Sequence, residues 1–188
     1  MLSEAKTRKT ILSTATMLFA NNAYNKVTIR KIAQSSNVSP SLIIYYFISK
    51  EKLYCQIFEE FFPELDRLLK NLKKEKELTL SKIVNSYIEI WRKNALIPVI
   101  IHRELLSLGD SEAKSRLDVR LLKPHKKKLI LLLSYIPECN SSNVEYYYTM
   151  VMSLATYPFI FAHINQETST DLSALQNVYE DTLVNLVR

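Results

Sequence analysis

Residues 27–53 read VTIRKIAQSSNVSPSLIIYYFISKEKL and contain three helix starts in quick succession. Each start has a Ser or Thr that can cap the first turn, and a branched apolar residue precedes each cap. The three caps are Thr28, Ser39 and Ser49. Pro40 follows the second cap at the first helical position, where its missing N–H costs nothing. The residue before each cap can pack on a residue one turn into the helix, which pairs Val27 with Ile32, Val38 with Ile43 and Ile48 with Leu53.

A further helix is expected before this stretch, and a tight turn within it. Apolar residues recur with helical spacing from Ile11 to Phe19, and that helix is expected to end near Asn21. Asn37 lies between the second and third helices, where a tight turn commonly needs one residue with positive φ, and Asn tolerates this best after Gly. Residues 28–47 are therefore predicted to form a helix-turn-helix, whose second helix enters the major groove of DNA.

Composition supports an all-α fold. The chain has 188 residues and a single glycine, Gly109, whereas hairpin turns usually require glycine. The two cysteines, Cys55 and Cys139, lie far apart and are interpreted as reduced thiols. The N-terminus lacks a secretory pattern, and the longest apolar runs fall short of the roughly 20 residues of a membrane span. A cytoplasmic protein without membrane contact is expected.

The positive charge is concentrated at the N-terminus. The whole chain carries a net charge of +6, and residues 1–52 contain eight basic and two acidic side chains, which accounts for all of it. A small basic module on a neutral body is typical of nucleic-acid binding. A solvated charged face is the alternative interpretation, although it would spread the charge more evenly along the chain.

The predicted third helix has more exposed apolar and phenolic groups than a core needs. Ile43 and Phe47, four residues apart, can anchor it to the first helix. Tyr45, Tyr46 and the remaining positions are then available to DNA. Tyrosine hydroxyls can donate to phosphate oxygens, and apolar side chains can contact thymine methyl groups.

From about Thr7 to Leu53 the sequence resembles the DNA-binding domain of TetR/AcrR-type bacterial transcriptional regulators. The resemblance includes TIRKIA at 28–33, Val38-Ser39, Tyr46-Phe47 and SKEKL at 49–53. It implies a helix-turn-helix domain over 1–52 and a helical regulatory and dimerisation domain over 53–188. It also implies a homodimer on a near-palindromic double-stranded operator. The residues it assigns to DNA binding are Thr28, Arg30, Ser39, Pro40, Ser41, Leu42, Ile44, Tyr45, Tyr46 and Lys50.

Two positions depart from the family pattern in a way that bears on specificity. Ile44 stands where many members have a phosphate-binding Tyr, and Leu42 stands where many have Thr. Two hydrogen-bonding positions are therefore apolar, and the contacts to the DNA backbone depend more on Tyr45, Tyr46 and Lys50. Our hypothesis is that Leu42 and Ile44 favour half-sites rich in thymine methyl groups.

The rest of the chain is expected to be helical. A helix over 50–75 links the DNA-binding domain to the body, and a later helix is expected to stop at Gly109. Pro124 is expected to break or kink the helix near Lys123. The KPHKKK run at 123–128 is interpreted as a solvated face, with an anion site as the less favoured alternative.

Two C-terminal helices, about 141–164 and 171–187, are predicted to form the homodimer interface. The first is apolar nearly all round, which predicts burial on more than one side. The second has a narrow apolar seam at Leu172, Leu175, Tyr179, Thr182 and Leu186. A packed core without a dimer is the alternative.

A ligand pocket for a small, largely apolar inducer is the family expectation. The candidate residues are aromatic, soft or polar groups in the body, although ordinary core is the stronger interpretation of such a stripe: Tyr87, Trp91, His102, Glu104, Met150, Met152, Tyr157 and Phe161. The three histidines have no partner at metal-ligand spacing, and neither a metal nor another cofactor is expected.

The predicted function is a ligand-responsive transcriptional repressor. An activator, or a structural or division-control protein on the same fold, is the alternative that the sequence leaves open. An enzyme is not expected, because the chain has no phosphate-binding glycine loop, HExxH motif or nucleophile elbow.

Overall fold

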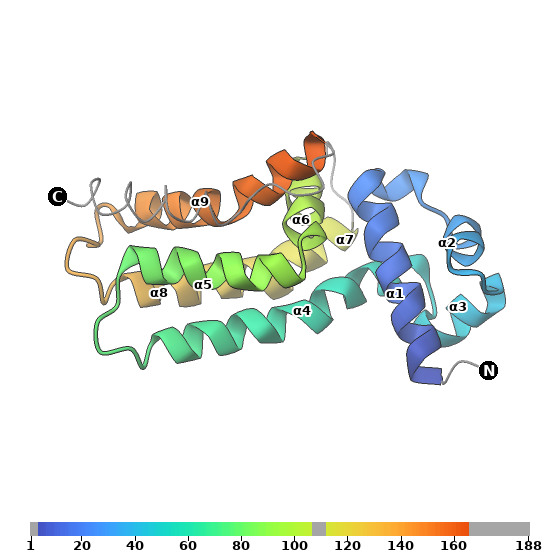
Figure 1. Cartoon of the computed structure of the whole chain (residues 1–188), viewed down its shortest axis with the longest axis horizontal. Helices are drawn as coiled ribbons and strands as arrows, with labels where there is room; N and C mark the ends of the chain where they lie inside the picture. Colours follow the sequence, from blue (N-terminus) through green and yellow to red (C-terminus); the bar gives the residue numbers. More distant parts are fainter. Residues whose placement is uncertain (1–3, 107–111, 166–188) are drawn as a thin grey trace.

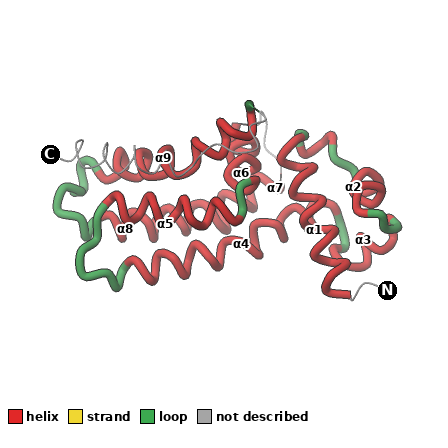
Figure 2. The backbone as a smooth tube through the Cα atoms, in the orientation of Figure 1, coloured by secondary structure: helices red, strands yellow, loops and turns green. Residues whose placement is uncertain are grey.

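The computed structural model describes residues 4–106 and 112–165, and the regular structure in these residues is entirely helical (Figure 2). This confirms the predicted fold class. In chain order the elements are α1 (Glu4–Asn21), a 3-10 turn (Tyr24–Lys26), α2 (Ile29–Ser36), α3 (Pro40–Phe47), α4 (Lys50–Leu72), α5 (Leu80–Lys93), α6 (Leu96–Leu106), α7 (Glu112–Leu117), a π-helical turn (Asp118–Leu122), α8 (Lys123–Leu133) and α9 (Val144–Ile164).

The helices form a small head and a longer body (Figure 1). Helices α1, α2 and α3 make the head, in which α1 packs on α2 and α2 packs on α3. Helix α4 leaves the head and runs along the body, where it contacts α5, α7 and α8. Helix α9 covers α5, α6 and α8. Helix α6 also contacts α1, so the head meets the body through α4 and α6.

The helix starts in the head form as their caps predict. The Thr28 hydroxyl oxygen accepts a hydrogen bond from the Lys31 backbone N–H at 3.1 Å, and Ser39 and Ser49 cap α3 and α4 in the same way. Asn37 has φ 54° and ψ 46°, the left-handed conformation expected of the turn. Local signals thus fix both ends of α2 and the start of α3.

The third predicted staple is wrong. Ile48 lies in the turn between α3 and α4 with φ 67° and ψ −46°, and the Ser49 N–H donates to the Phe47 carbonyl oxygen at 2.7 Å. This is a γ-turn, a strained conformation for a β-branched residue. The turn leaves the Ile48 side chain 63% exposed, while Leu53 is buried without it.

Pro124 acts close to where it was expected to. The chain widens into the π-helical turn at Asp118–Leu122 directly before α8. Proline has no backbone N–H, and its ring crowds the carbonyl group one turn earlier in a helix; a π-helical turn makes room for that carbonyl. Helix α4 also contains a proline, Pro63, without ending there. The expected stop at Gly109 and the seam from Leu172 to Leu186 lie outside the described residues.

One cluster of buried apolar side chains runs through the head and the body. Helix α9 contributes the buried residues Val151, Ala155 and Phe159 to it, and half-buried residues of the same helix pack against it, among them Met150, Met152 and Ile160. In the part of the chain that the structure describes, none of the helices combines the length and apolar character that a membrane crossing requires.

Candidate nucleic-acid interface and body cavity

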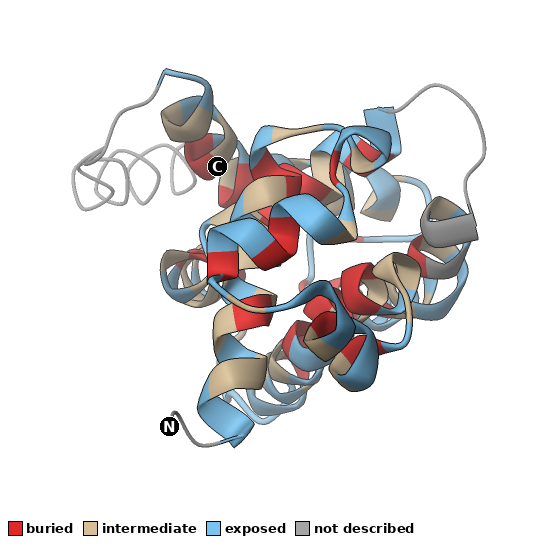
Figure 3. Cartoon of the chain, turned by 90° about the vertical axis from the view of Figure 1, so that its right-hand side faces the viewer, coloured by how far each residue is buried: buried red, intermediate tan, exposed pale blue. Residues whose placement is uncertain are grey.

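Helix α3 has one buried face and one open face. Ile43 and Phe47 are buried in the head, as the anchoring role predicted for them requires. Tyr45 and Ile44 lie on the open side, with 72% and 44% of their surface exposed. Figure 3 views the molecule from the end at which the head lies and marks its buried positions in red and its exposed positions in pale blue. An open helix face beside a tight turn is the geometry with which a helix-turn-helix reads a groove.

The two adjacent tyrosines differ in environment. Tyr46 is half-buried and packs on the core, and its ring meets the Phe47 ring with centroids 6.3 Å apart. Tyr45 is exposed and lies edge-on to Tyr46 at 5.2 Å. Leu42 is half-buried, whereas Pro40 and Ser41 are exposed. Tyr45 therefore has the more accessible phenol, and Tyr46 supports it from the side.

Polar residues predicted to bind DNA lie at the starts of α2 and α3. Thr28 and Arg30 are exposed at the start of α2, and Ser39 is exposed at the start of α3. The Ser39 and Ser41 hydroxyl oxygens lie 2.9 Å apart. The open N-terminal turns of α2 and α3 carry backbone N–H groups that suit phosphate oxygens.

Lys50 has an internal role that its sequence position did not reveal. Its ammonium donates to the carbonyl oxygens of Tyr24 at 3.0 Å and Val27 at 3.1 Å, and it lies 3.9 Å from the centroid of the Tyr24 ring. Partial burial lowers the pKa of Lys50 below its ordinary value. Two of its three N–H donors thus hold the segment before α2 to the start of α4.

Three further polar contacts link α1, α4, α6 and α9 in the region where the head meets the body. The buried phenol of Tyr54 on α4 donates to the Glu104 carboxylate on α6 at 2.9 Å. His163 on α9 meets the Ala20 carbonyl oxygen at the end of α1, at 3.2 Å. Arg8 on α1 forms an ion pair with Glu60 on α4. These contacts place α6 and α9 next to α4 and α1, the two helices that border the head–body junction.

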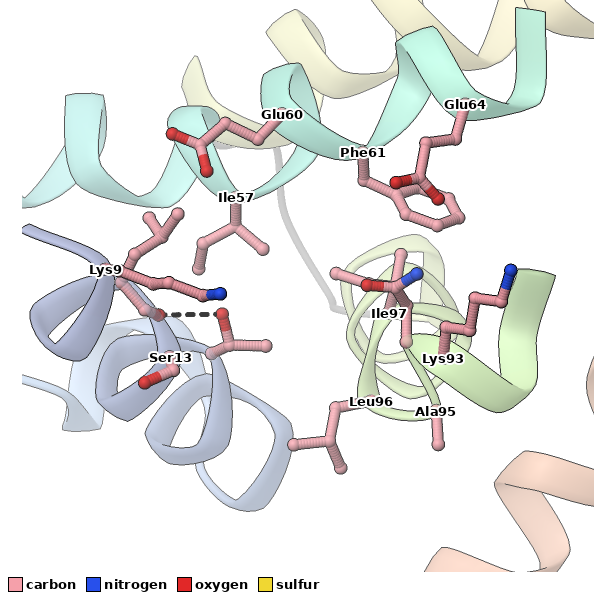
Figure 4. A pocket seen from close by; sticks show the side chains of 13 residues that line it. Lys9, Ser13, Ile57, Glu60, Phe61, Glu64, Lys93, Ala95, Leu96 and Ile97 are labelled. Atoms are coloured by element: carbon pink, nitrogen blue, oxygen red, sulfur yellow. Dashed lines mark hydrogen bonds between the residues drawn. The ribbon is translucent and has the colours of Figure 1, made fainter. Parts of the chain in front are cut away.

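A hollow of about 520 Å³ lies at this junction, between α1, α4 and the α5–α6 connection (Figure 4). Its lining includes the apolar residues Leu12, Ile57 and Phe61. Lys9 and Lys93 approach it from α1 and α5.

A second cavity, of about 350 Å³, lies within the body. Helices α4, α5, α6, α8 and α9 and the π-helical turn contribute to its wall. Of the predicted pocket residues, Trp91, His102 and Met152 line it. The others lie elsewhere: Tyr87 is buried beside Trp91 and His125, Glu104 binds Tyr54, Met150 is half-buried, and Tyr157 and Phe161 are exposed.

His125 lines this cavity, and sequence reasoning missed it. It belongs to the KPHKKK run that was interpreted as a solvated face, yet only 5% of its surface is exposed. Its Nε2 lies 2.7 Å from the Tyr87 hydroxyl, and burial lowers its pKa to about 4. A signal was available, because His125 precedes Leu129 and Leu132 with helical spacing and so shares their buried face.

The comparisons with known proteins agree with this geometry. Residues 11–57 match the family model described as bacterial regulatory proteins, tetR family. A TerR/AcrR-family transcriptional regulator from Aquifex aeolicus VF5 is 19% identical, with a TM-score of 0.73 over 96% of this chain and 99% of that one. The regulator FadR from Bacillus subtilis, solved with stearoyl-CoA, is 19% identical, with a TM-score of 0.70 over 95% and 96% of the two chains.

A third solved structure belongs to a repressor. NalD, the secondary repressor of the MexAB-OprM multidrug efflux pump in Pseudomonas aeruginosa, is 14% identical, with a TM-score of 0.64 over 96% of this chain and 95% of its own. A search of curated protein sequences finds no significant match. Residues 11–57 therefore match the DNA-binding segment of the tetR family, and the chain as a whole shares the fold of solved TetR/AcrR-type transcriptional regulators.

Proposed function

We propose that this protein is a homodimeric repressor that a small, largely apolar ligand releases from its operator. One observation carries the proposal: α6 takes part both in the body cavity and in the contact with the head. Ile101 and His102 line the cavity, and Glu104 on the same helix accepts the hydrogen bond from Tyr54 of α4. A ligand that moves α6 therefore acts directly on the helix that carries the DNA-binding head.

The release mechanism is a population shift. The ligand stabilises the arrangement of α6 that suits the filled cavity, and the Tyr54–Glu104 contact transmits this to α4. A changed α4 alters the separation of the two recognition helices in the dimer, which must match successive major grooves. A coupling free energy on the order of 1–3 kcal/mol is sufficient for a strong response.

The homodimer is proposed to form through α9 and residues 171–187, of which the latter lie outside the described residues. Helix α9 has a row of accessible apolar side chains at spacings of three, four and seven, which places them on one face. The row comprises Tyr146, Met150, Tyr157, Phe161 and Ile164. Accessible aromatic and aliphatic side chains gathered on one helix face are typical of a subunit interface.

The assignment of residues 1–52 to DNA binding and 53–188 to regulation remains part of this proposal, as do the individual DNA contacts. Two structural relatives support the choice of repressor and of an apolar ligand. NalD is named as a repressor, and FadR was solved with stearoyl-CoA. The ligand of either relative is a property of that relative, so the ligand of this chain must be found by experiment.

The test measures DNA binding by fluorescence anisotropy, with duplexes from upstream of the protein's own gene and a scrambled duplex as control. Preference for the native duplex with a steep salt dependence is expected. The Tyr45→Ala variant is expected to lose affinity by at least about tenfold, whereas the Tyr135→Ala variant, altered at an exposed position of the body, retains it. Equal weak binding to both duplexes by the wild type would contradict self-regulation and require selection of the operator from random DNA.

Oligomeric state and sign of regulation need separate measurements. Light scattering is expected to give a dimer that the Tyr157→Asp substitution dissociates, while Tyr135→Asp leaves it intact. A reporter gene under the selected operator then separates a repressor from an activator. Expression that rises when the regulator is deleted supports repression, and expression that falls contradicts it.

A further inference from the structure

We propose that the body cavity takes a small organic acid, with an apolar portion held by the cavity wall and a carboxylate held by buried N–H donors. This inference rests on the proposed function and deepens it, because it names the chemical class of the ligand. It follows from three features of the wall: unpaired polar atoms, the sign of its charge, and its size.

Among the residues that the structure describes, two buried polar atoms of the wall have no hydrogen-bond partner. They are Nε1 of Trp91 and Nδ1 of His125, and both side chains line the cavity. The residues are 1% and 5% exposed, so bulk water does not satisfy them. Buried polar atoms without partners are rare in folded proteins and require an explanation. A ligand that fills the cavity supplies one.

Both atoms are donors. An indole nitrogen can only donate. The Tyr87 hydroxyl lies 2.7 Å from Nε2 of His125, and a phenol is the more acidic of the two groups, so Tyr87 donates to Nε2. Burial lowers the pKa of His125 to about 4, which keeps the imidazole neutral. Nδ1 therefore carries the single ring proton, and a ligand that satisfies the wall must present acceptors.

The charge of the wall favours an anion among possible acceptors. Lys123 and Lys126 line the cavity, and Asp118 is the one carboxylate among the lining residues that the structure describes. Asp118 already pairs with Lys123 at 2.7 Å. Lys126 pairs with Glu145 at 2.8 Å, outside the cavity wall, where the Glu145 side chain is 61% exposed. Exposed ion pairs are weak, so the Lys126 ammonium can exchange Glu145 for a ligand carboxylate.

The remaining wall and the volume define the rest of the ligand. Apolar side chains make up most of the other lining residues, including Phe62, Leu65, Pro98, Ile101 and Met152. The volume of about 350 Å³ lies at the lower end of the range for small-molecule sites. The cavity therefore suits a short-chain or single-ring acid better than a long acyl chain joined to a nucleotide.

The chain contains one tryptophan, and it lines this cavity, so its emission reports on this site. The full-length protein is titrated at pH 7 with octanoate, octan-1-ol and octylammonium, which share an alkyl chain and differ in the head group. Octanoate is expected to change the Trp91 emission and to bind at least about tenfold more tightly than the alcohol, with the ammonium weakest.

Two variant pairs test which groups hold the carboxylate. Lys126→Gln is expected to weaken octanoate binding several-fold and leave octan-1-ol unchanged. Its matched control is Lys127→Gln, on the same helix but exposed and away from the wall. The double variant His125→Phe with Tyr87→Phe removes the ring N–H without leaving the phenol unpaired. It is expected to abolish the preference for acid over alcohol while circular dichroism shows a folded protein.

Three results overturn the proposal. One is equal or tighter binding of octan-1-ol or octylammonium than of octanoate. Another is the absence of any effect on Trp91 emission and melting temperature by saturated acids from butanoate to dodecanoate and by phenylacetate. The third is the same octanoate affinity in the Lys126 and Lys127 variants. If a neutral compound releases the operator and no acid binds, the proposed ligand class is refuted and the proposed repressor function stands. If octanoate binds the protein but the protein binds no operator, the proposed ligand class stands and the repressor function is refuted.

Discussion

Removing the Tyr54 hydroxyl provides a direct test of the contact that joins the head to the body. Tyr54 is 2% exposed and Glu104 is 5% exposed, and the hydrogen bond between them spans α4 and α6. Burial and the neighbouring Glu104 raise the pKa of the Tyr54 phenol, so the hydroxyl stays protonated at neutral pH. Tyr54→Phe keeps the ring in its edge contacts with Phe19, Tyr24 and Phe58 and deletes only the donor.

The expected cost follows from the burial of both partners. Loss of a hydrogen bond to a carboxyl group that stays buried destabilises a protein by about 1.5–3 kcal/mol. For a chain of this length each 1 kcal/mol lowers the melting temperature by about 2–4 °C. Tyr54→Phe is therefore expected to lower the free energy of unfolding by about 2 kcal/mol and the melting temperature by about 4–8 °C.

Urea unfolding and calorimetry at one fixed protein concentration measure both quantities, because a dimer's melting temperature depends on concentration. The matched control is Tyr135→Phe, at a position 57% exposed, where a change within about 0.5 kcal/mol is expected. A double-mutant cycle with Glu104→Gln isolates the pair and is expected to give a coupling energy of 0.5–3 kcal/mol, by the usual range for contacting residues. Equal effects of Tyr54→Phe and Tyr135→Phe, or a coupling energy near zero, would refute this reasoning.

Three further predictions concern single positions. Ile48→Gly is expected to stabilise the protein by about 1 kcal/mol in urea unfolding, because glycine adopts the positive φ at this position without strain, whereas the control Ile44→Gly within α3 is expected to destabilise it by about 1 kcal/mol. Destabilisation by both variants would show that Ile48 is not strained. Lys50→Met is expected to cost about 1–3 kcal/mol through the two carbonyl contacts, and Lys52→Met close to nothing; equal melting temperatures would contradict the internal role of Lys50. Burial lowers the folded-state pKa of His125 to about 4, so between about pH 6.5 and pH 4 the unfolded chain binds a proton that the folded chain does not. The free energy of unfolding is therefore expected to fall over this pH range, by at most about 3 kcal/mol. His125→Phe should flatten this part of the stability profile, and an unchanged slope would show that other groups cause it.

The apolar positions of α3 give a prediction about the operator. Selection from random DNA is expected to enrich thymine at the positions that face Leu42 and Ile44, because both side chains can contact thymine methyl groups. Ile44→Tyr is expected to relax that preference and leave the salt dependence of binding at least as steep. A selected operator with no thymine preference at these positions would contradict the hypothesis.

The sequence by itself determined the head of this protein. Thr28, Ser39 and Ser49 cap their helices through N–H groups only three residues away, and Asn37 forms the turn through its own backbone. Such signals act within one helical turn, so a linear sequence contains them in full. The buried positions of α3 likewise follow from the spacing of Ile43 and Phe47.

The tertiary structure alone decided the environment of the body's polar groups. Glu104 binds a phenol 50 residues away, and His125 binds one 38 residues away. Lys50 binds carbonyl oxygens 26 and 23 residues before it. A polar side chain on an amphipathic helix has the same pattern whether it faces a cavity, a partner or water. Its role depends on which distant helix packs against it, and that is set by the packing of the whole core.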